Sequence, residues 1–143
     1  MEHRGKAGRD LTTSVVMHIQ NLAILKGLVS VAWADGRLAG EEKEVLEALL
    51  QAFEASPSEA HEIRLFAREP KKLNDVPIHD LSADARRVLL QHAVLLSFAD
   101  GEQDEREKKI IDELCEVLRI PAIESRGLIA ASEERAKSLL KLL

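Results

Sequence analysis

Apolar residues recur at helical spacing along most of the chain. After residue 40, Val45, Leu46, Leu49 and Leu50 follow one another at intervals of one, three and one, while charged residues occupy the opposite face. No segment alternates strictly between apolar and polar residues, as a half-buried strand does. The pattern predicts an all-α fold, a single-domain helical bundle of about seven helices.

The segment from Val88 to Ala99 is apolar nearly all the way round, and Leu22 to Ala34 is its counterpart when the sequence is aligned with itself. A helix without a polar face belongs in the centre of a bundle. We therefore predict that these two helices contact each other, related by a pseudo-twofold axis.

The chain contains an internal duplication. When the sequence is shifted by 65 positions, Ala34-Asp35-Gly36 falls on Ala99-Asp100-Gly101, and Glu42 falls on Glu107. Apolar positions on both sides of the turn also match, which indicates a repeated supersecondary unit. Each unit is predicted to be a helix, an Asp-Gly turn and a second helix.

The repeat sets the expected domain organisation. Repeat 1 covers about residues 15–55 and repeat 2 about 82–120, within one helical domain over residues 11–143. Residues 1–10 carry no apolar periodicity and are expected to form a flexible N-terminus.

Helix starts can be placed from capping residues. Ser56 to Glu59 combines an N-cap serine, a proline at the first position and a glutamate able to close a capping box, so a helix to about Arg68 is expected. Ser82 caps the following helix, Pro121 opens another, and Ser132 is predicted to start a last one.

Composition and charge exclude several classes of function. The chain is 45% hydrophobic and 3% aromatic, so its core is aliphatic, and its net charge of −5 argues against binding nucleic acid. No run of about 20 apolar residues exists that would insert into a membrane. The single cysteine, Cys115, reads as a core residue of a protein in a reducing, cytoplasmic compartment.

The Asp-Gly turns admit two interpretations. In the structural one, Gly36 accepts a positive φ and Asp35 caps free backbone amides. In the other they hold a cation, because glycine and glutamate have EF-hand spacing. A complete EF-hand is excluded, because Val31 and Trp33 would occupy ligand positions in repeat 1.

Acidic residues crowd the second loop more than the first. The metal-ligand candidates, with hard oxygen ligands that suit calcium, magnesium or manganese, are first Asp100, Asp104 and Glu107, and then Asp35 and Glu42. The candidate surface for a protein partner consists of Glu102, Asp104, Glu105 and Glu41.

An apolar helix ending in Ala-Asp-Gly, a glutamate after five further residues and an amphipathic helix, present twice, resembles the TerB tellurite-resistance family and the related N-terminal domain of DjlA-type co-chaperones. The resemblance spans about residues 11–143. It implies an all-helical cytoplasmic protein associated with tellurite and stress-response operons, whose partners include membrane-associated proteins. By motif, Asp35, Glu42, Asp100 and Glu107 match the family's positions.

No catalytic residues are assigned, because the sequence lacks a phosphate-binding loop, a nucleophile elbow and zinc-ligand spacing among its histidines. The leading hypothesis is a non-enzymatic module that binds a protein partner through its acidic surface, with a divalent cation contributing. The alternative is a metal-binding or metal-sensing protein. Homodimerisation is left open.

Overall fold

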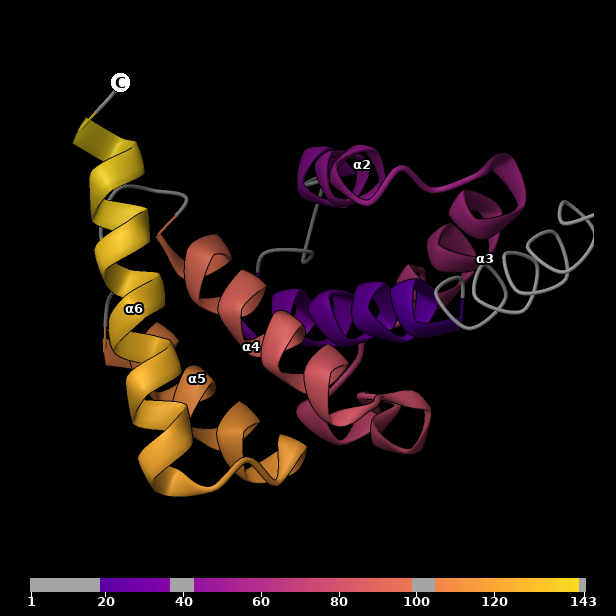
Figure 1. Cartoon of the computed structure of the whole chain (residues 1–143). Coiled ribbons are helices and arrows are strands. Elements are labelled where there is room, and N and C mark those ends of the chain that lie inside the picture. Colours follow the sequence, from indigo (N-terminus) through magenta and orange to yellow (C-terminus); the bar gives the residue numbers. More distant parts are fainter. Residues whose placement is uncertain (1–18, 37–42, 99–104, 142–143) are drawn as a thin grey trace, which may run out of the picture.

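The computed structural model describes residues 19–36, 43–98 and 105–141, and these form an all-α, single-domain bundle, as the sequence predicts (Figure 1). Within these ranges there is no strand. One helix covers residues 19–34 and is called helix 19–34 below. The other elements are α2 (Lys43–Ala52), α3 (Pro57–Ala67), the 3₁₀ helices η1 (Leu73–Asp75) and η2 (Ile78–Asp80), α4 (Ala83–Ser97), α5 (Glu105–Leu118) and α6 (Ala122–Lys141).

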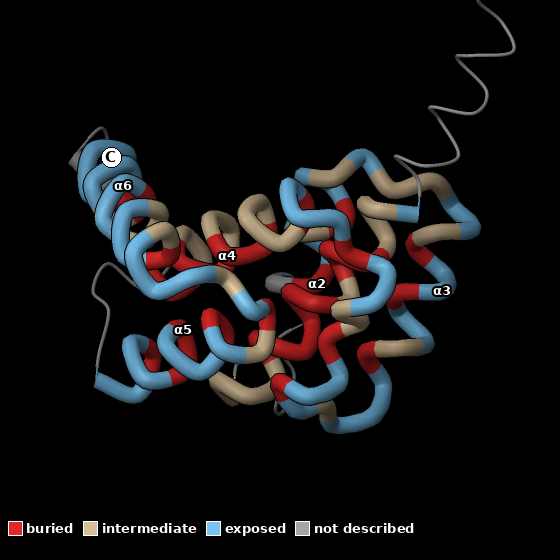
Figure 2. Tube along the Cα trace, turned by 60° about the horizontal axis from the view of Figure 1, so that its bottom comes forward, coloured by how far each residue is buried: buried red, intermediate tan, exposed pale blue. Residues whose placement is uncertain are grey.

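Helix 19–34 is buried on two faces. Leu25 and Val29 belong to a smaller apolar cluster with α2 and α3, whereas Ile24, Leu28 and Val31 belong to a larger cluster with α4, α5 and one residue of α6. Such two-sided burial requires a helix that is apolar nearly all the way round. Figure 2 shows buried residues on the inner sides of the helices and exposed ones outward.

The predicted contact between helix 19–34 and α4 is confirmed. A Cβ atom built at Gly27 would lie 2.5 Å from Leu89 Cδ2, so the backbone of helix 19–34 approaches the Leu89 side chain as closely as only glycine allows. Leu89 is itself fully buried. The pseudo-twofold relation between the two units stays a prediction.

Two of the predicted helix caps form as expected. Glu59 N–H donates to Ser56 Oγ at 3.2 Å and Ser56 N–H donates to Glu59 Oε1 at 3.1 Å, which completes the capping box of α3. Ala85 N–H donates to Ser82 Oγ at 3.1 Å at the start of α4.

The loop between α3 and α4 is tied to the bundle by side chains that bind its backbone. Gln20 donates through Nε2 to the carbonyl of Asp80 and accepts through Oε1 from the N–H of Ser82, both at 2.9 Å. Arg86 donates to three carbonyl groups, those of Ile78, Leu81 and Leu118. The last of these carbonyls ends α5, so one guanidinium joins the loop to the second repeat.

The C-terminal part differs from the prediction of two helices. A single helix, α6, runs through Ser132, which is buried within it rather than capping a new helix. The residues around Ser132 are alanine and glutamate, which favour an uninterrupted helix. Arg87 on α4 pairs with Glu124 on α6, which fixes the start of α6 against α4.

None of the described helices is both long and apolar enough to cross a membrane. The predicted flexible segment, residues 1–10, lies outside the described residues.

We expect Gly27→Ala to lower the free energy of unfolding by about 1 kcal/mol or more, because the added methyl group overpacks against Leu89 by more than the gain in helix propensity. Gly127→Ala on α6 is the matched control, since nothing lies within 4 Å of a Cβ there. It should raise the free energy of unfolding by about 0.5–1 kcal/mol. Chemical denaturation measures both, and equal stabilisation by the two substitutions would refute the close approach.

Candidate functional site

Three of the predicted acidic residues lie within the described part of the chain. Asp35 directly follows helix 19–34, and Glu105 and Glu107 lie in the first turn of α5. The remaining predicted metal and partner-surface residues lie outside the described residues: Glu41, Glu42, Asp100, Glu102 and Asp104.

The turn at Asp35 is set by the end of helix 19–34. Asp35 N–H donates to the carbonyl of Val31 at 2.9 Å, and Gly36 N–H donates to that of Trp33 at 3.0 Å. Gly36 then has a φ of +82°, in the left-handed region that glycine enters without strain. The predicted conformation of this glycine is therefore correct, and it determines where the chain leaves the helix.

The indole of Trp33 positions this helix end in the bundle. Its Nε1–H donates to the carbonyl of Ala67 at 3.0 Å, at the last residue of α3. That bond satisfies a carbonyl left without an intrahelical partner at the end of α3 and links the turn to it. The end of helix 19–34, next to Asp35, is therefore held against the end of α3.

Glu107 and Glu105 have opposite environments although only one residue separates them. Glu107 is 7% exposed, whereas the side chain of Glu105 is 93% exposed and lies 3.5 Å from Lys108 Nζ. The cause is helical spacing, because Glu107 precedes Ile110 and Ile111 by three and four positions and so shares their inward face.

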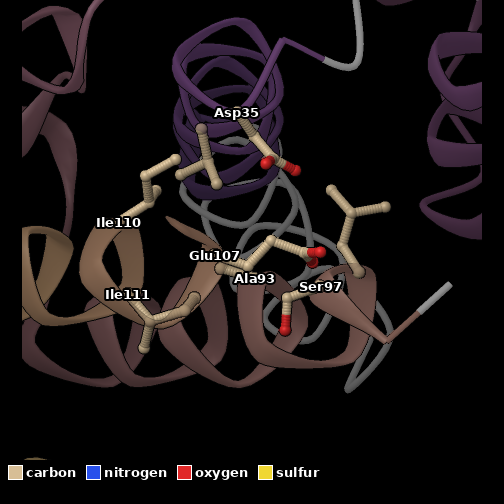
Figure 3. A pocket seen from close by; sticks show the side chains of 8 residues that line it. Asp35, Ala93, Ser97, Glu107, Ile110 and Ile111 are labelled. Atoms are coloured by element: carbon tan, nitrogen blue, oxygen red, sulfur yellow. The ribbon is translucent and has the colours of Figure 1, made fainter. Parts of the chain in front are cut away.

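Asp35 and Glu107 line one small cavity between helix 19–34, α4 and α5, with a volume of about 10 Å³. Figure 3 shows their carboxyl groups directed toward the same space. Ser97 also lines it, and its hydroxyl donates to the carbonyl of Val94 at 2.6 Å. None of these three residues is without an interaction partner. The rest of the lining is apolar and consists of Val31, Ala93, Leu96, Ile110 and Ile111.

The first turn and the start of α5 also meet, at Gly36. Arg106, at the start of α5, places a guanidinium nitrogen 3.6 Å from where a Cβ of Gly36 would stand. The end of the first helix in repeat 1 and the start of the second helix in repeat 2 are therefore neighbours. The sequence alone predicts two separate loops and carries no signal of this pairing.

The chemistry of the cavity suits a hard cation. Carboxylate oxygens are the preferred ligands of calcium, magnesium and manganese, and a volume of roughly 10–15 Å³ holds one water-sized particle. Within the described ranges, no group of three or more His, Cys, Asp or Glu side chains is placed to hold a metal ion. The described residues thus supply two carboxylates, and the further predicted ligands Asp100 and Asp104 lie outside them.

Two other candidate residues have structural roles. His92 Nδ1 lies 2.9 Å from the carbonyl of Val88, and the His92 ring packs on Phe53 with 5.1 Å between centroids. Cys115 is buried among core residues, and this burial raises the pKa of its thiol. A protonated, enclosed thiol is a poor nucleophile.

Comparison of the chain with protein-family models, with curated proteins and with solved structures finds no match.

Replacing Gly36 tests the turn that directs Asp35. We expect Gly36→Ala to lower the free energy of unfolding by about 1–2 kcal/mol, because alanine is strained at positive φ although space for its methyl group exists. Gly36→Asn should cost less, since asparagine tolerates this conformation. Thermal and chemical denaturation give the comparison. An alanine variant as stable as the native chain would contradict the assigned backbone conformation.

Proposed function

We propose that this protein is a non-enzymatic, stress-response-associated module of the TerB type that binds a protein partner through an acidic surface and uses a divalent cation at the Asp35 and Glu107 cavity. One observation carries the proposal: carboxylates from the two helix, Asp-Gly turn, helix units are directed into one cavity of about 10 Å³.

A cation in this cavity would act as a link between the repeats. Two carboxylates that share a small space repel each other, and a divalent cation between them replaces repulsion with attraction. Asp35 directly follows helix 19–34, and Glu107 lies in the first turn of α5, so this link controls how these two ends meet.

The partner surface proposed at the start of α5 depends on the same geometry. Glu105 is exposed in the first turn of α5, and the predicted surface residues Glu102 and Asp104 immediately precede it in the sequence. A cation held by Glu107 would position this acidic segment and partly neutralise it. Partner affinity should then depend on the cation.

Burial of Glu107 favours a second candidate function, in which binding or sensing the ion is itself the activity. A carboxylate that is 7% exposed can contribute little direct contact to a docked protein. It can still coordinate an ion, because carboxylate oxygens are the ligands that calcium and magnesium prefer.

The non-enzymatic part of the proposal is supported by how the chemically versatile side chains are used. Cys115 lies in the core with a raised pKa, and His92 is engaged with a backbone carbonyl and an aromatic ring. Both residues therefore contribute to packing.

Cation binding predicts a gain in thermal stability. In chelator-treated protein, adding calcium, magnesium or manganese at a concentration of about 100 Kd should stabilise the fold by about 2.7 kcal/mol. Asp35→Asn and Glu107→Gln should abolish most of this gain, because each removes a charged ligand from the cavity. Calorimetric titration and thermal melting measure the effect.

Glu105→Gln provides the matched control, since it makes the same chemical change two residues from Glu107 on an exposed side chain. It should leave cation binding unchanged. Affinity weaker than about millimolar, or equal loss in all three variants, would eliminate the cation from the proposal.

Charge reversal tests the partner surface separately. We expect the triple variant Glu102→Lys, Asp104→Lys, Glu105→Lys to capture at least about tenfold less partner protein. A partner that recognises the acidic surface would then face a surface of like charge. Quantitative affinity purification of the native and reversed chains, with and without chelator, provides the measurement. Partners retained at native levels would show that this surface serves solubility alone. If the native chain loses its partners only when chelator is added, partner binding depends on the cation.

A further inference from the structure

A second concave feature lies on the other side of Ile110. It is an open groove of about 450 Å³ between the segment that contains η1 and the exposed side of α5. Ile110 lines both this groove and the Asp35 and Glu107 cavity. A volume of this size is in the range that accommodates a ligand or a short peptide segment.

The groove has apolar contributions from three parts of the chain. Ala34 comes from the end of helix 19–34, Leu73 from η1, and Ile110 and Val117 from α5. Apolar surface that a partner covers supplies binding energy in proportion to its area. The groove is therefore able to receive an apolar side chain.

The two walls carry opposite charges. Lys71 and Lys72 line one wall, and Glu113 and Glu116 line the other. Lys71 Nζ lies 4.5 Å from the centroid of the Phe66 ring. Among the described residues, none of these four side chains forms an ion pair. Lysines on one side and glutamates on the other thus line the groove without forming ion pairs with one another.

The length of the groove limits its occupant. From Ile110 to Val117 there are seven helical steps of about 1.5 Å, which span roughly 10 Å along α5. An extended segment in the polyproline II conformation advances about 3.1 Å per residue and directs three consecutive side chains in three directions. Three such residues match the length of the groove, and their three side chains match its basic wall, its acidic wall and its apolar part.

We propose that this groove binds a short extended segment of a partner protein in which a basic, an apolar and an acidic residue follow one another. The apolar side chain enters toward Leu73 and Ile110, the basic one faces Glu113 and Glu116, and the acidic one faces the two lysines. This inference rests on the proposed partner-binding function and specifies the chemistry of one partner segment.

The test uses the full chain and a library of random twelve-residue peptides displayed on phage. Selection on the native protein should enrich triplets with a basic, a central apolar and an acidic residue by at least about tenfold over the input library. Selection on the Glu113→Lys, Glu116→Lys variant should change the preference to acidic, apolar, acidic, because both walls are then positive. Both substituted residues are exposed, so the fold is expected to persist, which thermal melting checks.

The Glu133→Lys, Glu134→Lys variant is the charge-matched control, because these residues are on α6 and do not line the groove. It should select the same triplets as the native chain. For a selected peptide, the reversal at Glu113 and Glu116 should weaken the Kd at least tenfold and the control should not.

Absence of the enriched triplet, or a triplet preference that survives the reversal, overturns the proposal. Self-association of the native chain in sedimentation experiments that the reversal abolishes would assign the groove to a second copy and would overturn it as well. Neither result depends on Asp35, Glu105 or Glu107, so failure of the groove is distinguishable from failure of the proposed function.

Discussion

The fold depends on burying one helix on two opposite sides. Helix 19–34 provides Leu25 and Val29 to the cluster with α2 and α3, and Leu28 and Val31 to the cluster with α4 and α5. A helix in this position has little surface left for charged residues, and Lys26, with a side chain 28% exposed, pairs with Glu62 on α3. It also has to approach its neighbours closely, and the glycine opposite Leu89 makes this approach possible. The positions of the turn, the cavity and the groove all follow from how this helix is held.

Local sequence patterns predict much of the fold, because helical periodicity and helix capping depend on residues only a few positions apart. Ser56 and Glu59 form their capping box as the sequence indicates. The same local reasoning fails at Ser132, where a residue suited to an N-cap lies inside a continuous helix. A serine caps a helix only when the residue before the helix is not helical. The alanines before Ser132 favour helix, so the chain continues through Ser132 without a break.

The candidate site was predictable in part. Glu107 lies three, four and seven positions before Ile110, Ile111 and Leu114. Helical spacing therefore predicts its place on the buried face. Its pairing with Asp35 is not, because 72 positions separate the two residues and the crossing of helix 19–34 with α5 brings them together. The groove is even harder to predict from the sequence. Its lysines belong to a loop that Gln20 and Arg86 anchor by hydrogen bonds to backbone carbonyls. Such bonds leave no periodic pattern in the sequence.

Ile110 lines two spaces of different chemistry, the Asp35 and Glu107 cavity and the groove. A packed side chain shared in this way cannot shift toward one space without withdrawing from the other, because protein interiors are close-packed. A ligand in one space that displaced the Ile110 side chain would therefore change the shape of the other, and the two sites would be linked thermodynamically. Linkage of this kind is reciprocal: the factor by which one ligand changes the affinity of the other is the same in both directions. Ile110 thus borders both an ion-sized space and a peptide-sized space.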